Sequence, residues 1–172
     1  MSWSRRSVLG CLLTAGCGFH PLYGERSGGG ADAAVADELA AIRIESIPDR
    51  IGQEMYNMLR DRLNPDGRPG APRYVLRVAL TEHSDVLFIS DNQTASRIDL
   101  TLKAAYTLNQ AGSGEVVAKG ASRSTASYDV LPVGNEFATV VSEDDARRRA
   151  ARQISDDIRT RLALALTSNA AG

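Results

Sequence analysis

The residue best placed for covalent chemistry is Cys17, one of two cysteines in the chain. It follows Ala15 and Gly16, and small residues before a cysteine are typical of the cleavage site of a bacterial lipoprotein signal. The thiol would be the nucleophile that takes a diacylglycerol, and cleavage would leave Cys17 as the first residue. Leucine usually stands three residues before such a cysteine, whereas here Thr14 holds that position and Leu13 lies one further out.

Residues 1–16 have the layout of a cleaved signal peptide. A basic start at Arg5 and Arg6 is followed by an apolar run over residues 8–13, which is too short to span a bilayer as a helix. Paired arginines occur in twin-arginine signals and in ordinary ones, so the export route stays open. Cys11 is a weaker candidate for lipidation. The alternative is an apolar amino-terminal strand or helix with an incidental buried cysteine, but charge, length and small residues all favour the signal.

Other chemistry has little support in the sequence. His20 and His83 are the only histidines, and no cluster of histidines and carboxylates has metal-ligand spacing, so no metal or cofactor is expected. No nucleophile elbow, zinc motif or phosphate-binding loop is present. His83 beside Ser84 and Asp85 is not a triad, because neighbours on a strand point to opposite faces. These observations argue against an enzyme, with a small envelope hydrolase as the alternative.

Composition and charge predict one domain behind a tether. The 172 residues contain 20 Lys+Arg and 21 Asp+Glu, a balance that gives no reason to expect nucleic-acid binding. We divide the chain into a signal peptide (1–16), a lipidated anchor and flexible tether (17–36), and a single domain (37–172). The tether is predicted because residues 24–36 are rich in Gly and Ala.

Hydrophobic periodicity predicts the first half of this domain. Residues 41–47 alternate in polarity and favour a short strand. Asp49 can cap a following helix, whose apolar face recurs every four residues. That face consists of Ile51, Met55, Leu59 and Leu63.

In the second half of the domain, apolar and polar residues first alternate with a period of two, and apolar residues then recur with helical spacing. Strands are predicted around residues 74–80, 97–108 and 116–128, with a hairpin loop at 109–115. The last helix is predicted to begin at Ser142, with Asp145 as its capping-box partner. The order β-α-β-β-β-α predicts an α+β two-layer sandwich, in which two helices cover one face of a four-stranded, mostly antiparallel sheet.

Several segments resemble the LptE family of lipopolysaccharide-assembly lipoproteins, in the form found in alphaproteobacteria. The most specific is Cys-Gly-Phe-His-Pro-Leu-Tyr at residues 17–23. The others are Tyr128, Phe-Ala-Thr at 137–139, Asp145-Ala146, and the helical positions Ile154, Ile158 and Leu162. The resemblance spreads over most of the mature chain, and the predicted element order agrees with the fold of that family.

The resemblance implies a role and no reaction. LptE proteins sit inside the β-barrel LptD in the outer membrane, where they plug its lumen, help it fold and assist delivery of lipopolysaccharide to the cell surface. Family members also contact lipopolysaccharide itself. Gly18 replaces the Asp that retains enterobacterial lipoproteins in the inner membrane, which is consistent with a lipid-anchored, periplasm-facing protein of the outer membrane. An independent lipoprotein binding module for envelope maintenance, acting without a barrel, stays open as the alternative.

Two groups of residues are candidates for contact with such partners. The first comprises cations expected opposite the apolar stripe of the sheet, suited to lipid A phosphates: Arg73, Arg77, Arg97, Lys103, Lys119 and Arg123. The second is an apolar run that could insert into a partner: Val86, Leu87, Phe88 and Ile89. The alternatives are a solvated strand face with local ion pairs, and a strand that continues into the core.

Overall fold

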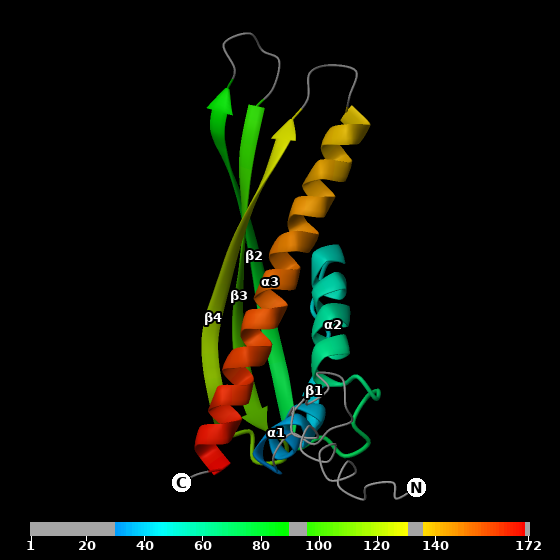
Figure 1. Cartoon of the computed structure of the whole chain (residues 1–172), viewed down its shortest axis with the longest axis vertical. Helices are drawn as coiled ribbons and strands as arrows, with labels where there is room; N and C mark the ends of the chain where they lie inside the picture. Colours follow the sequence, from blue (N-terminus) through cyan, green and yellow to red (C-terminus); the bar gives the residue numbers. More distant parts are fainter. Residues whose placement is uncertain (1–29, 90–95, 131–135, 171–172) are drawn as a thin grey trace, which may run out of the picture.

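The computed structural model describes residues 30–89, 96–130 and 136–170, so Cys17 and the predicted signal peptide lie outside the described residues. The described elements form two layers, a sheet and a layer of helices (Figure 1). In chain order they are α1 (Gly30–Ala40), β1 (Ile42–Ile44), α2 (Arg50–Leu63), β2 (Tyr74–Ile89), β3 (Ser96–Gln110), β4 (Val116–Val130) and α3 (Glu136–Ala170).

The sheet has the strand order β1-β2-β3-β4. The short β1 runs parallel to β2, while β2, β3 and β4 form an antiparallel meander. Gly112 and Gly114 have positive φ in the loop between β3 and β4, a conformation that glycine adopts at no steric cost, as the predicted hairpin requires. The α+β prediction with a mostly antiparallel four-stranded sheet is therefore confirmed.

The helices lie on one face of this sheet, where even-numbered side chains of the long strands point. Leu100, Leu102 and Leu108 of β3 are fully buried there against Leu59 of α2 and Ile158 of α3. Figure 1 shows α3 running the length of the sheet, whereas α2 covers only its lower half and α1 lies at the base. Two helices thus cover the face as predicted, and a third closes the lower end.

Close packing in this core depends on a glycine in β4. Gly120 is directly opposite Tyr106 of β3 in the ladder, and Tyr106 is buried at 6% exposure. A Cβ atom at position 120 would lie 2.6 Å from the Tyr106 hydroxyl oxygen, so only glycine leaves room for the ring.

Three local predictions were wrong. Residues 30–36, predicted as tether, are helical in α1, because alanine favours helix and the buried Leu39 holds this helix on the core. The last helix begins at Glu136, so Ser142 lies within it and is no cap. Asp49 occupies the amino-terminal cap position of α2 with φ 68°, but its side chain makes no capping hydrogen bond.

The apolar run at residues 86–89 belongs to strand β2, whereas we predicted either an inserting loop or a strand entering the core. The ladder shifts between Val86 and Phe88, so Leu87 is an extra residue in a β-bulge. Val86 and Leu87 are 60% and 58% exposed. The strand therefore continues as in the second alternative, but these two side chains do not enter the core.

Candidate functional site

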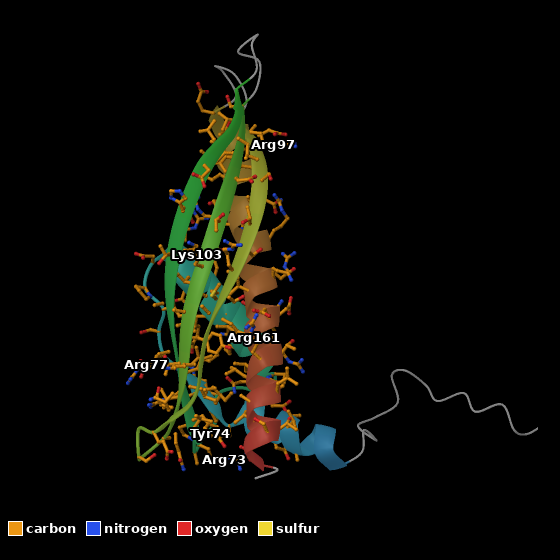
Figure 2. All side chains as sticks on the ribbon, turned by 90° about the vertical axis from the view of Figure 1, so that its left-hand side faces the viewer. Arg73, Tyr74, Arg77, Arg97, Lys103 and Arg161 are labelled. Atoms are coloured by element: carbon orange, nitrogen blue, oxygen red, sulfur yellow. The ribbon has the colours of Figure 1, made fainter. Side chains whose placement is uncertain are left out.

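The sheet face opposite the helices, here called the open face, carries five of the six predicted cations. Figure 2 shows Arg97 near the distal end, Lys103 midway and Arg77 towards the base, so the cations follow the length of the sheet. Lys119 and Arg123 share this face, because they are in register with Thr107 and Lys103 of β3. Alternation along the strands therefore placed these five residues correctly.

Arg73 is the exception, because it precedes the first residue of β2 and turns to the helical layer. Its guanidinium lies 2.9 Å from a carboxylate oxygen of Glu38 in α1 and donates to the backbone carbonyl of Asp37. Burial raises the pKa of Tyr74, and the neighbouring Glu38 raises it further. Arg73 thus ties α1 to the start of β2 and lies outside the open face.

Two cations of the open face are neutralised by carboxylates. Arg77 donates to Glu45 at 2.9 Å, and Arg97 donates to Asp129 at 3.0 Å. These hydrogen bonds raise the pKa of each guanidinium. Exposed pairs of this kind contribute little to stability, but they reduce the positive charge that a ligand would meet.

Lys103, Lys119 and Arg123 form no ion pair within the described residues. Lys103 and Arg123 are directly opposite each other in the ladder, and like charges at such positions repel. All three side chains are exposed. We call these three residues the cationic patch, since they leave a positive charge on the open face that an anionic partner would stabilise.

Apolar side chains are exposed at the distal end of the molecule, where β2 ends and α3 begins (Figure 1). Phe137 is 82% exposed, and Val140 and Val141 are 55% and 50% exposed. With Val86 and Leu87 of β2 they form what we call the distal tip. The sequence predicted the β2 part of this surface as an apolar contact candidate. Phe137 was noted only as one of the residues that resemble the LptE family.

An ion network below the tip joins β2, α2 and α3. Arg147 of α3 donates to both carboxylate oxygens of Glu82 at 3.0 and 3.1 Å and also binds Glu143. Its pKa is raised, chiefly by the hydrogen bonds to Glu82. Asp144 in turn accepts a hydrogen bond of 2.9 Å from Arg50 of α2. The arginines at 147–149 are thus all paired with acids, as is typical of the polar face of a helix.

The described residues contain neither a metal-binding cluster nor a membrane-spanning helix. No group of three or more histidine, cysteine or carboxylate side chains could hold a metal ion in the part of the chain that the structure describes. No described helix is both long and apolar enough to cross a membrane. The cationic patch and the distal tip are candidate surfaces for contact with a partner.

The fold defines a class of small α+β proteins known from several bacterial lipoproteins. A Caulobacter crescentus protein classed as a lipoprotein superimposes with a TM-score of 0.63 at 21% identity, over 77% of this chain and 95% of that one. A minor lipoprotein from Acinetobacter baumannii superimposes with a TM-score of 0.54 at 16% identity, over 72% of this chain and 91% of that one. The rare lipoprotein B of Shewanella oneidensis superimposes with a TM-score of 0.50 at 15% identity, over 76% of this chain and 96% of that one.

The sequence narrows this class to one family. Residues 39–162 match the LptE family of lipopolysaccharide-assembly proteins, and the chain belongs to that family. No curated protein matches the chain in a direct sequence comparison. The match runs from Leu39 at the end of α1 to Leu162 in α3, one turn before the last buried residue of that helix, so it includes the cationic patch and the distal tip. LptE is a lipopolysaccharide-assembly family and not a known family of enzymes.

Proposed function

We propose that this protein is the lipoprotein partner of an LptD-type outer-membrane barrel, which it plugs and helps to assemble during lipopolysaccharide transport. The observation that carries the proposal is the LptE match over residues 39–162, which spans nearly the whole described domain. A plug needs a rigid body with surfaces for the barrel and for lipopolysaccharide, and the domain has one candidate surface for each.

The distal tip is the proposed contact with the barrel. Its apolar side chains are exposed between 50% and 82%, and such exposure at one end of a molecule is typical of an interaction site. Burial of these side chains in a partner would contribute favourable free energy, because it removes apolar area from water.

The cationic patch is the proposed contact with lipopolysaccharide. Lipid A phosphates would accept charge-assisted hydrogen bonds from Arg123 and Lys103 and would relieve the repulsion between these two cations. The paired Arg77 and Arg97 are secondary contacts, because Glu45 and Asp129 already occupy them.

Cys17 is the proposed attachment site of the lipid, after removal of residues 1–16. More than one acyl chain on this residue would hold the protein stably on a membrane, where a single chain gives only marginal binding. The segment between Cys17 and the start of α1 would then link the anchor to the base of the domain.

A pull-down of the tagged, lipidated chain from its native membranes tests the partnership with the barrel. We expect an LptD-type barrel at near one-to-one stoichiometry in the mass-spectrometric analysis. The double variant Phe137→Ser/Val140→Ser should lower barrel recovery at least tenfold, because it makes the tip polar. Leu164→Ser/Val116→Ser is the matched control, since these residues are 66% and 53% exposed but lie away from the tip.

A folded wild-type chain that is recovered without a barrel would contradict the proposal and favour an independent lipoprotein binding module. Equal loss of the barrel in the tip and control variants would show that the tip is not the contact surface.

Lipopolysaccharide binding is tested by charge reversal in the patch. Lys103→Glu/Arg123→Glu should weaken binding of purified lipopolysaccharide about tenfold or more, whereas Arg77→Glu should have a smaller effect because Arg77 is already paired. Circular dichroism of each variant controls for folding. Unchanged binding in the double variant would remove the cationic patch from the proposal.

A further inference from the structure

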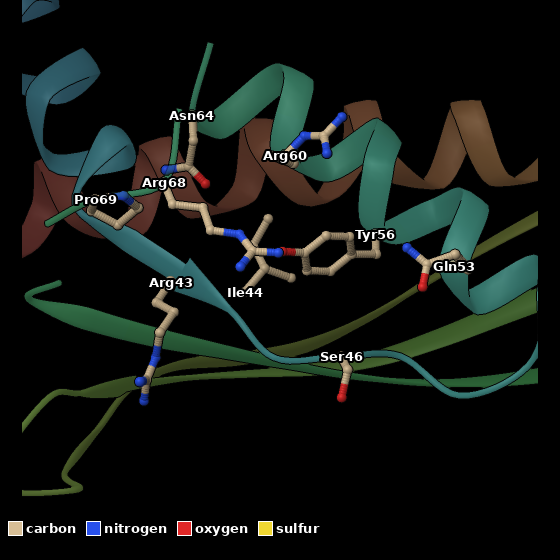
Figure 3. A pocket seen from close by; sticks show the side chains of 9 residues that line it. All are labelled: Arg43, Ile44, Ser46, Gln53, Tyr56, Arg60, Asn64, Arg68 and Pro69. Carbon is tan, nitrogen blue, oxygen red and sulfur yellow. The ribbon is translucent and has the colours of Figure 1, made fainter. Parts of the chain in front are cut away.

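A cavity of about 340 Å³ opens between β1 and the outer side of α2, near the base of the domain (Figure 3). It lies away from both the cationic patch and the distal tip. Its lining residues are Arg43, Ile44, Ser46, Gln53, Tyr56, Arg60, Asn64, Arg68 and Pro69.

The lining of this cavity has an unbalanced charge. Three arginines line it and no carboxylate does, so its formal charge is positive. A second cavity, on the other side of α2's first turn, is lined by Arg50 and Arg147 together with three carboxylates, Asp49, Glu54 and Asp144. A cavity whose lining carries a positive charge without lining acids would be stabilised by a bound anion.

Most polar side chains of the first cavity have no partner of their own. Arg43 and Arg68 form neither an ion pair nor a hydrogen bond within the described residues, and the same holds for the side chains of Gln53 and Tyr56. Arg60 is the exception among the arginines, because it binds its neighbour Asp61 at 2.9 Å. The cavity is therefore lined by several donors for which the described residues supply no acceptor.

Two of the donors lie close together. Figure 3 shows Arg68 reaching across the cavity towards the hydroxyl of Tyr56, whereas Arg43 extends from β1 and Arg60 from α2 away from these two groups. A guanidinium can donate two parallel hydrogen bonds to a phosphate, and a phenol hydroxyl adds a further donor. Asn64 has a different role, because its amide nitrogen donates to the carbonyls of Ala40 and Ile42 and so fixes the wall.

We propose that this cavity binds a phosphate-class anion, with Arg68 as its central donor and Tyr56 as the supporting donor. The site goes beyond the proposed partnership with a barrel and does not depend on it. Two sources share this chemistry: the phosphate of an anionic membrane lipid, and a free phosphorylated molecule of the periplasm.

Calorimetric titration of the full chain in detergent tests the site with inorganic phosphate, at fixed ionic strength. A parallel titration uses micelles that contain phosphatidylglycerol. We expect saturable binding in at least one titration and an affinity at least tenfold lower in Arg68→Gln. Tyr56→Phe should lower the affinity by a smaller factor, because it removes one neutral donor. The matched control is Arg152→Gln, an exposed arginine of α3 outside the cavity, which should bind as wild type does.

The two titrations distinguish the sources. Saturable binding of phosphate without an effect of phosphatidylglycerol indicates a free ligand, whereas saturable binding of phosphatidylglycerol that depends on Arg68 indicates a lipid headgroup. No saturable binding in either titration, or equal affinities of Arg68→Gln and wild type, would overturn the proposal. Arg68 is exposed, so the variant should fold and should still recover the barrel, which separates this test from that of the proposed function.

Discussion

The lower half of the domain and its distal end are built from the same long elements, yet they bury their side chains very differently. In the lower half, α3 buries a residue every three or four positions from Ala146 to Leu166. Above Ala146, no residue of α3 that the structure describes is buried. The strand β3 changes in the same way, since its burial begins only at Leu100.

The change in burial occurs at the level of the amino-terminal end of α2. This helix begins at Arg50, which binds Asp144 of α3, so α2 covers nothing beyond that level. Below it, the sheet, α2 and α3 enclose a continuous core, and above it only α3 accompanies the strands. The apolar side chains of the tip are therefore not a poorly packed extension of the core. They lack a second helix to pack on and are therefore exposed.

The largest expected effect of a substitution is a cavity in the lower half. Leu59→Ala removes a fully buried side chain of α2 and should lower the free energy of unfolding by about 2–5 kcal/mol. Phe137→Ala at the tip should change it by at most about 0.5 kcal/mol, because that ring is largely exposed. Urea unfolding measures both. A large loss of stability in Phe137→Ala would mean that the tip is part of the folded core.

An intermediate effect is expected at the boundary between the two regions. Arg147→Met removes the hydrogen bonds to Glu82 and leaves two carboxylates without their cation, which should cost about 1–2 kcal/mol. Hydrogen exchange should become faster in residues 136–145 and should stay slow in the lower half of α3. Uniform acceleration along the whole helix would show that the network supports both regions equally.

The smallest effect is expected on the pH dependence of stability, at an ion pair between α2 and α3 in the lower half. Arg62 of α2 donates to Asp156 of α3, and this hydrogen bond lowers the pKa of the carboxyl group. A lowered folded-state pKa contributes stability above the unfolded-state value of about 3.9, and this stability is lost as pH falls through the folded-state value. Arg62→Gln should therefore reduce the loss of thermal stability below about pH 4.

The matched control for this pH dependence is Arg123→Gln, because Arg123 has no carboxylate partner within the described residues. Its acid profile should follow that of wild type. Identical profiles for Arg62→Gln and wild type would show that the link between α2 and α3 contributes nothing measurable.

Periodicity in the sequence predicted those elements whose burial is regular. The alternation of β3 and the four-residue spacing of Met55, Leu59 and Leu63 each reflect one continuous buried face, and these predictions are confirmed. The first turns of α3 escaped prediction because Phe137 and Val140 are apolar without being buried, so no helical stripe marks them. Helix α1 escaped because its Gly- and Ala-rich sequence is equally typical of a tether.

The candidate site was predictable in position but not in charge. Strand parity put Arg77 and Arg97 on the open face, but their neutralising partners lie 32 residues away in the sequence, at Glu45 and Asp129. No local pattern reports such pairing. The bulge at Leu87 sets a second limit, because an extra residue changes the register beyond it and parity counted from the base no longer applies.

The length of α3 sets the distance between the base of the domain and its distal end. At 1.5 Å per residue, its 35 residues extend for about 50 Å, whereas the hydrocarbon layer of a bilayer is about 30 Å thick. Helix α1, which follows the proposed anchor, lies at the base, and the apolar turns of α3 lie at the opposite end (Figure 1). A protein held by acyl chains in one leaflet could thus carry its far end to the level of the other leaflet without a membrane-spanning segment of its own, provided that a barrel shields it from lipid.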